Sequence, residues 1–320
     1  MKSRSPFFSV IIPTFNRGHL ISKSIESLLD QTFLDFEIII IDDASTDNTK
    51  EIVSLFLDDR IHYFKNIKNE ERCVSRNRGI EKSKGEYICF LDSDDYHLPN
   101  HLERIYQEIK LKEEPKAFFF VNAWDEDVNG NKSERCCPDY EIMDGYTYFL
   151  HYTVNPQRWA VHHSIFKEIQ FDPEVVICED MDTSLRVLAH LFPVFQIKER
   201  TTVYVAAPDS FTNSDTNKAA KELFYLKKIF QKKELKNQLP LNERNRLLSM
   251  CHFHLAIKSN NEKLRWKTHF HSIQSFFLYP KGYNGKTNKI LLVMNLYQLL
   301  IFGDLLRIIK NKLTLRKNAI

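Results

Sequence analysis

The sequence of 320 residues has little glycine and no cysteine pair of the kind that binds zinc or exchanges disulfides. Its 8 glycines argue against long flexible linkers and low-complexity segments. The six cysteines are scattered without any C-x-x-C spacing, which excludes a zinc ribbon and a thioredoxin motif. Unpaired cysteines in a chain of this length are typical of a reducing compartment.

The sequence also lacks a long apolar run. The run at residues 7–12 is too short for the core of a signal peptide and ends at Pro13. The nearest candidate for a spanning helix, residues 290–302, is interrupted by Asn295 and Gln298, and such a helix needs about 20 apolar residues. We therefore expect a cytoplasmic protein.

The net charge of +3 hides two oppositely charged regions. Residues 217–320 contain 21 Lys and Arg against 5 Asp and Glu, whereas residues 1–216 have a net charge of −13. This asymmetry predicts different partners for the two regions. An acidic region can hold a metal, and a basic region can meet an anionic surface.

Strand and helix patterns alternate over the first 121 residues. Apolar or β-branched runs predict strands at residues 9–13, 37–41, 61–64, 86–91 and 117–121. Helical spacings lie between them at residues 20–29, 49–57, 73–82 and 99–111. This alternation indicates βαβ units and an α/β fold with a mostly parallel sheet.

The second half of the chain has a different pattern. Periodicity is weak over residues 124–156, and a helix at 180–191 is followed by short strands at 195–197 and 202–206. Beyond residue 217 only helices are predicted, at residues 219–230, 241–258, 263–277 and 289–309.

Acidic clusters follow two of the predicted strands. Asp42 and Asp43 follow one strand, and the Asp-Ser-Asp-Asp run at residues 92–95 follows another. Ligands of open parallel sheets bind outside the carboxyl ends of the strands. Two carboxylates one residue apart can share a hard divalent cation that also bridges substrate phosphates. An acidic loop that caps the next helix is the alternative interpretation.

Two further clusters, one acidic and one basic, contain residue types that are found in catalytic or phosphate-binding sites. Glu179 and Asp180 open a predicted helix, whose dipole favours an ionised carboxylate suited to a general base. A simple helix cap is the alternative. The arginines of residues 72–78 can bind phosphate or can lie on a solvated helix face.

Taken together, these motifs resemble glycosyltransferase family 2. The resemblance begins with Ser-Val-Ile-Ile-Pro-Thr-Phe-Asn-Arg at residues 9–17, Gln-Thr at 31–32 and Ile-Asp-Asp-Ala-Ser-Thr-Asp at 41–47. It continues with Arg76-Asn77, Gly-Glu-Tyr at 85–87, Phe-Leu-Asp-Ser-Asp-Asp at 90–95, and Glu179-Asp180 followed by Arg186. Each motif is weak alone, whereas the ordered set over about residues 9–190 is specific.

The resemblance implies a GT-A-type, Rossmann-like sheet flanked by helices, a nucleotide-diphosphate-sugar donor, Mn²⁺ or Mg²⁺, and inversion at the anomeric carbon. It implies that Asp94 binds the metal and that Asp92 binds the metal or the ribose. Asp180 would be the catalytic base. The nucleotide-sugar site would consist of Pro13, Thr14, Phe15, Asn16, Asp42, Asp43, Arg76, Asp92 and Ser93. Within it, Phe15 would stack on the base and Asp43 would recognise it, which suggests uracil and leaves thymine and guanine open.

The predicted catalytic domain covers residues 1–215, with a donor half at about 1–122 and an acceptor half at about 123–215. A basic all-helical region follows at residues 216–320. Many family members carry a His shortly before a Ser after the acidic motif, as an extra phosphate or metal ligand. Residues 205–211 contain no His, so this ligand is not expected here.

Other residues have weaker interpretations. Candidates for acceptor binding are Trp159, His162, His163 and Glu179. Core packing is the alternative for Trp159. His97 and His101 are four residues apart and could share a metal, but ordinary surface histidines are the preferred interpretation.

The basic and apolar segment 281–312 suits an interfacial helix on the inner face of the plasma membrane. A helix packed on the catalytic domain, or a contact in a homodimer, is the alternative. Nucleic acid is not an expected partner, because no recognised binding motif occurs.

The predicted function is therefore a metal-dependent inverting glycosyltransferase that uses a UDP-sugar. Its acceptor would be a hydroxyl of a glycan or a lipid-linked glycan in surface polysaccharide synthesis. A sugar nucleotidyltransferase would need a Gly-rich loop after the first strand, which is absent. A non-catalytic nucleotide-sugar-binding or membrane-binding module would be expected to lack one of Asp92, Asp94 and Asp180, and all three are present.

Overall fold

The computed structural model describes residues 5–113, 115–206, 217–262 and 265–279. The chain divides into two compact units. The first comprises Met1–Thr216 together with Lys228–Leu239, and the second comprises Asn217–Lys227 together with Pro240–Ile320. The segment Lys228–Leu239 thus belongs to the same unit as the acidic motifs, although the sequence places it in the basic C-terminal region.

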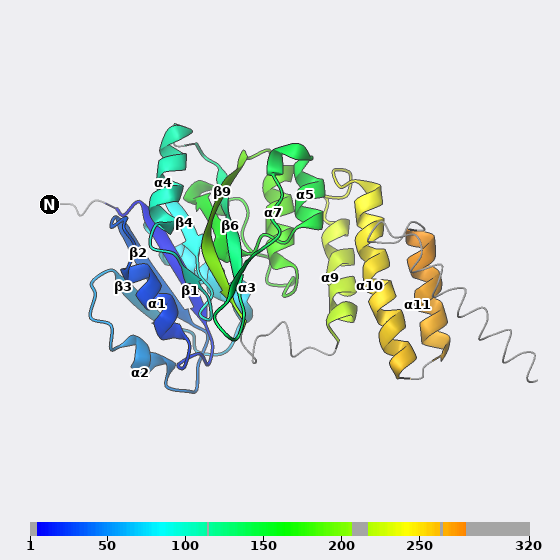
Figure 1. The fold of residues 1–320 in the computed structure, drawn as a ribbon, viewed down its shortest axis with the longest axis horizontal. Coiled ribbons are helices and arrows are strands. Elements are labelled where there is room, and N and C mark those ends of the chain that lie inside the picture. Colours follow the sequence, from blue (N-terminus) through cyan, green and yellow to red (C-terminus); the bar gives the residue numbers. More distant parts are fainter. Residues whose placement is uncertain (1–4, 114, 207–216, 263–264, 280–320) are drawn as a thin grey trace, which may run out of the picture. The chain divides into compact units, whose positions relative to one another are not determined.

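The first unit is built on one sheet, in which Figure 1 labels β1–β4, β6 and β9. The strand order is β3-β2-β1-β4-β8-β6-β9-β5, and β7 pairs with β6. The strands are β1 Phe8–Thr14, β2 Phe36–Asp42, β3 Ile61–Lys65, β4 Tyr87–Phe90, β5 Tyr96–His97, β6 Phe118–Glu126, β7 Lys132–Glu134, β8 Trp159–His162 and β9 Val194–Val205. The first four strands in this order run parallel. Strand β8 lies antiparallel between β4 and β6, so the whole sheet is mixed.

Helices cover both faces of this sheet, which confirms the predicted α/β fold. They are α1 Ile21–Leu29, α2 Thr49–Val53, α3 Glu71–Lys82, α4 His101–Leu111, α5 Gly145–His151, α6 His163–Phe166 and α7 Glu179–Ala189. The C-terminal helices are α9 Lys218–Gln231, α10 Leu241–Asn261 and α11 Arg265–Leu278. No helix within the described ranges is both long enough and apolar enough to cross a membrane.

The isoleucine run of β2 reflects burial on both faces, as expected for a central parallel strand. Ile38 and Ile40 belong to the core that also contains residues of α1 and α4. On the opposite face, α3 lies against β1 so closely that a Cβ on Gly79 would be 2.4 Å from Cγ2 of Ile11. Only glycine permits this approach, and the approach sets the position of α3.

The predictions are less accurate in the second half of the first unit. Strand β8 and helix α5 were not expected, because the local periodicity there is weak. The two short strands predicted at residues 195–197 and 202–206 are one strand, β9, whose pairing with β6 is irregular around Asn122. The helix predicted at 289–309 and the membrane segment 281–312 lie outside the described residues.

The contact between α3 and β1 gives a first prediction. Gly79→Ala should lower the free energy of unfolding by about 1–3 kcal/mol, because the added methyl group overpacks against Ile11. Urea denaturation would measure the change. In the Ile11→Ala background the same substitution should cost less, because the clashing side chain is gone; fully additive effects would contradict this contact.

Candidate active site

Apart from Arg76 of α3, the predicted donor residues lie at the carboxyl ends of three adjacent strands. Strand β1 is central, with Thr14 paired to Asp42 at the end of β2 and Ile11 paired to Phe90 at the end of β4. The segment that follows β1 therefore lies between the two acidic clusters. The sheet order brings together groups that are up to 80 residues apart in the chain.

The loop after β1 is fixed by Asn16 and leaves an aromatic ring exposed. Asn16 has a positive φ of 52°. Its backbone N–H donates to Ser45 Oγ at 2.9 Å, and its Oδ1 accepts from the Thr46 N–H at 2.8 Å. Phe15 next to it is 42% exposed, whereas Thr14 is buried with a hydroxyl that has no partner within the described part of the chain. The exposed ring thus belongs to the loop, and the buried hydroxyl belongs to the end of β1.

The two aspartates after β2 differ in what they can still bind. Asp42 is fully buried, and its carboxylate accepts from the Ser45 N–H at 2.7 Å and from the Tyr63 hydroxyl. It therefore supports the loop, which corrects its prediction as a nucleotide-sugar ligand.

Asp43 is also buried but keeps accepting capacity. Its Oδ1 receives bonds from Asn66 Nδ2 at 2.7 Å and the Glu70 N–H at 3.0 Å, whereas its Oδ2 receives only a longer bond of 3.2 Å from the same N–H. Asp43 therefore stays a candidate for base recognition.

The acidic run after β4 alternates between buried and accessible side chains. Ser93 and Asp95 are buried, whereas Asp92 and Asp94 are partly exposed. Asp95 accepts from the Val205 N–H and from Gln157 Nε2, both at 2.8 Å, so it fastens the loop to the end of β9. Burial, together with the neighbouring acidic side chains, raises the pKa of Asp95. The other two carboxylates of the run, Asp92 and Asp94, are therefore the ones that reach the surface of this loop.

These two carboxylates fit a metal that is shared with a substrate. No group of three or more His, Cys, Asp or Glu side chains in the described ranges is arranged to hold a metal ion by itself. Mg²⁺ and similar ions are commonly bound through one or two carboxylates, with substrate phosphates and water as the other ligands. Asp92 and Asp94 supply that donor set.

A buried arginine joins the acidic run to the start of α7. Arg76 of α3 is only 2% exposed. Its Nη1 donates to Glu179 Oε1 at 2.8 Å and its Nη2 donates to Asp92 Oδ1 at 3.1 Å. These carboxylates raise the pKa of Arg76 despite its burial. The two acidic motifs, 87 residues apart, are therefore parts of one site.

Asp180 follows Glu179 at the start of α7. The preceding Cys178 has a left-handed backbone, with φ of 64°. Such strain in a non-glycine residue is found most often at functional sites. Burial, followed by the adjacent Glu179, raises the pKa of Asp180 to about 7. A carboxylate that titrates near neutral pH suits a general base.

Three of the predicted acceptor residues lie elsewhere. Trp159 is fully buried, stacks on Phe171 at 5.7 Å and donates to the Val154 carbonyl at 2.7 Å, so it is a core residue. His162 pairs with Tyr87, and the His163 N–H donates to the Glu86 carbonyl at 2.8 Å. Both histidines are thus at the start of β4.

Five residues of extended chain separate the start of β4 from Asp92, which corresponds to about 16 Å. This position contradicts the prediction of His162 and His163 as acceptor ligands. Glu179, by contrast, lies at the site through its bond to Arg76.

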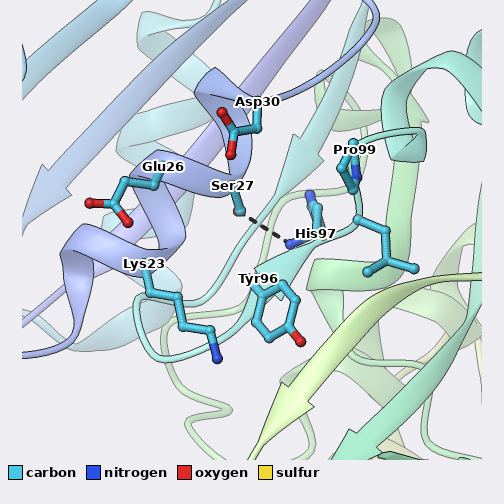
Figure 2. Close-up of a pocket in the computed structure, with 8 residues that line it drawn as sticks. Lys23, Glu26, Ser27, Asp30, Tyr96, His97 and Pro99 are labelled. Atoms are coloured by element: carbon cyan, nitrogen blue, oxygen red, sulfur yellow. Dashed lines mark hydrogen bonds between the residues drawn. The ribbon is translucent and has the colours of Figure 1, made fainter.

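The preferred interpretation of His97 and His101 as surface residues is wrong. They are 2% and 0% exposed, and their rings stack at 3.6 Å. Figure 2 shows His97 beside Ser27, whose Oγ accepts the His97 N–H at 3.3 Å, in a pocket of about 240 Å³ between α1 and β5. None of the candidate site residues lines this pocket.

Two buried amides that support the site belong to no sequence motif. Asn66 holds Asp43, and Gln157 holds Asp95. Single Asn and Gln residues outside a motif are common, so only their burial, 3% and 2% exposed, identifies them.

Comparison with known proteins places this site in a family. The model of "Glycosyl transferase family 2" matches residues 9–169, just over half of the chain, and the chain belongs to this family. The putative colanic acid biosynthesis glycosyl transferase WcaA of Escherichia coli K12 is 31% identical over 206 residues, which cover 62% of this chain and 72% of the relative. Some other curated relatives are matched over only about a third of this chain and less than half of their own length.

Solved structures show the same fold. S. aureus TarS 1–349 in complex with UDP-GlcNAc has a TM-score of 0.62 and 19% identity, with 86% of this chain and 82% of that chain covered. The mannosyltransferase PcManGT of Pyrobaculum calidifontis, in complex with GDP-Man and Mn²⁺, has a TM-score of 0.59 and 14% identity, with 85% and 74% covered.

The chain is therefore an inverting glycosyltransferase with a GT-A-like fold. This membership replaces the alternatives of a sugar nucleotidyltransferase and a non-catalytic module. Residues 179 and 180 lie beyond the matched segment, so the role of Asp180 depends on the geometry described above.

The buried Arg76 gives a second prediction. Arg76→Met should lower the free energy of unfolding by roughly 3–5 kcal/mol, because it removes the buried cation that pairs with both Asp92 and Glu179. The matched control is Arg72→Met, since Arg72 is more exposed and lies 3.8 Å from the same Glu179. It should cost less than about 1 kcal/mol. Equal losses in urea denaturation would show that Arg76 is not the central cation.

Proposed function

We propose that the chain is a metal-dependent glycosyltransferase that moves a sugar from a UDP-sugar to a hydroxyl of a glycan or lipid-linked glycan in surface polysaccharide synthesis. The observation that carries this proposal is the bridge from Asp92 through Arg76 to Glu179, which brings Asp180 to the acidic strand end. The name of the E. coli relative supports the polysaccharide pathway, and the UDP-GlcNAc complex of TarS supports the donor class.

In this proposal the donor nucleotide binds along the end of β1. Phe15 stacks on the base through its exposed ring, and Asp43 accepts a hydrogen bond from the base through Oδ2. The Thr14 hydroxyl, buried and without a partner within the described residues, supplies a further bond to the nucleotide. Pro13, Asn16 and Ser93 shape the walls of this site.

Asp94, together with Asp92, would hold Mn²⁺ or Mg²⁺ against the diphosphate. The bound metal would neutralise the charge that develops on the leaving nucleoside diphosphate. Arg76 keeps Asp92 in place through its bond of 3.1 Å. The Mn²⁺ in the PcManGT complex supports this assignment.

Asp180 would accept the proton of the acceptor hydroxyl, which then attacks the anomeric carbon on the face opposite the leaving group. This displacement inverts the configuration and needs no covalent enzyme intermediate. With a pKa of about 7, Asp180 is ionised in a large fraction of molecules at neutral pH and still takes up a proton readily.

A lipid-linked acceptor would bring the enzyme to the inner face of the plasma membrane. The basic segment 281–312 is the part of the chain that we propose to meet that surface. This association is peripheral and separate from the chemistry of the site.

The general base gives a third prediction. Asp180→Asn should abolish transfer and retain UDP binding, because it removes the proton acceptor and leaves the strand ends intact. For the wild type, kcat/KM should rise with pH through about 7 and then level off, since only the carboxylate acts as the base.

Activity and UDP titration at several pH values would test both statements. The control is Asp30→Asn, an exposed residue on the pocket between α1 and β5, which should behave as wild type. Full activity in Asp180→Asn would remove this assignment.

Metal dependence gives a fourth prediction. EDTA should stop transfer and added Mn²⁺ or Mg²⁺ should restore it, and Asp94→Asn should raise the metal concentration needed for half activity. A thermal-shift and hydrolysis screen of nucleotide sugars with and without Mn²⁺ would also identify the donor. Turnover unchanged by the chelator would exclude the proposed metal.

A further inference from the structure

A partly buried cation outside the family-matched residues contacts the helix that carries Asp180. Lys232 follows α9, and its side chain is 15% exposed. Its Nζ lies 2.7 Å from the carboxylate of Asp182 and 2.8 Å from Oδ2 of Asp172. Asp182 is fully buried in the first turn of α7, two residues after Asp180.

The second partner of Lys232 leads back to Arg76. Asp172 is adjacent to Phe171, whose N–H donates to Asn77 Oδ1 at 3.0 Å and whose carbonyl accepts from Asn77 Nδ2 at 2.8 Å. The Phe171 ring lies 5.4 Å from the guanidinium of Arg76. Lys232 therefore contacts both α7 and the loop that supports the central arginine.

Charges alternate around this contact. Arg186, one turn further along α7, lies 3.4 Å from Asp182, and Glu234 lies 3.4 Å from Arg186 Nε. Lys232 thus pairs with the acidic Asp182, and Glu234 pairs with the basic Arg186, both of which belong to α7. All four residues belong to the first compact unit, so the network is internal to it.

The acidic first turn of α7 needs a positively charged partner. It contains three carboxylates, Glu179, Asp180 and Asp182, and all three are buried. The helix dipole favours them, but desolvation and mutual repulsion oppose their ionisation. Burial raises the pKa of Asp182, and Lys232 acts in the opposite direction. Without Lys232, Asp182 keeps only the longer contact of 3.4 Å with Arg186, which favours uptake of a proton or a shift of this turn toward water.

We propose that Lys232 is a positioning residue for Asp180. By pairing with Asp182 and Asp172, it fixes the first turn of α7 relative to the strand ends, so that Asp180 faces the acceptor hydroxyl. This inference rests on the proposed function, in which Asp180 is the base. Because Lys232 does not touch the donor in this role, it acts on the rate of transfer and not on donor binding.

The test compares three variants of the full chain. Lys232→Met keeps the aliphatic stem and removes the charge, Lys232→Arg keeps the charge, and Lys233→Met changes an exposed neighbour in the same surface groove. Titration with UDP gives the concentration of UDP-binding sites, and kcat is calculated from that concentration. Misfolded protein is thereby excluded from kcat.

Lys232→Met should lower this kcat by about 10- to 100-fold with the donor KM changed less than about two-fold, as expected for a misplaced catalytic group. Lys232→Arg should recover most of the rate, and Lys233→Met should behave as wild type. Wild-type kcat in Lys232→Met, an equal loss in Lys233→Met, or a loss confined to donor KM would each overturn the proposal.

A double-mutant cycle identifies the partner. Asp182→Asn removes the carboxylate that loses its closest cation in Lys232→Met, so the double variant should be less impaired than the product of the single effects. If the kcat loss of the double variant equals the product of the two single losses, Lys232 does not act through Asp182. Full activity of Asp180→Asn would overturn the proposed function itself, whereas an inactive Asp180→Asn beside a wild-type Lys232→Met would overturn only the positioning role.

Discussion

The site depends on the pairing of one buried guanidinium with two carboxylates. Arg76 has almost no access to water and is held between Asp92 and Glu179. Burying a charge is costly unless opposite charges and hydrogen bonds replace the water, so the buried Arg76 needs both carboxylates. Asp92 follows β4, whereas Arg76 and Glu179 belong to α3 and α7, and these elements are distant in sequence. The candidate site therefore forms only when the first unit has folded as a whole.

Local patterns predicted the first half of the fold well because its signals are local. A strand buried on both faces, such as residues 38–41, is a continuous apolar run, and amphipathic helices have their own spacing. Strand β8 was missed because its place depends on partners far along the chain. It is inserted between β4 and β6, and its Trp159 is stabilised by Phe171 and Phe118.

The sequence predicted those residues of the candidate site whose position follows from the order of the strands. Residues after β1, β2 and β4 had to meet at one edge, and they do. Burial and strand direction decided the rest: Asp42 is enclosed, and the antiparallel course of β8 takes His162 to the opposite edge. Lys232 belongs to no motif, since an ion pair across 50 residues leaves no local pattern.

The segment Lys228–Leu239 belongs to the first unit. This membership determines where two related enzymes could be joined to form a chimera. The sequence suggests a natural junction near residue 216, where the acidic region gives way to the basic one. A chimera joined there would receive its α7 and its Lys232 from different parents. Recombination after Leu239 would keep the charged network of one ancestor intact. The inherited module is therefore longer than the change in composition suggests.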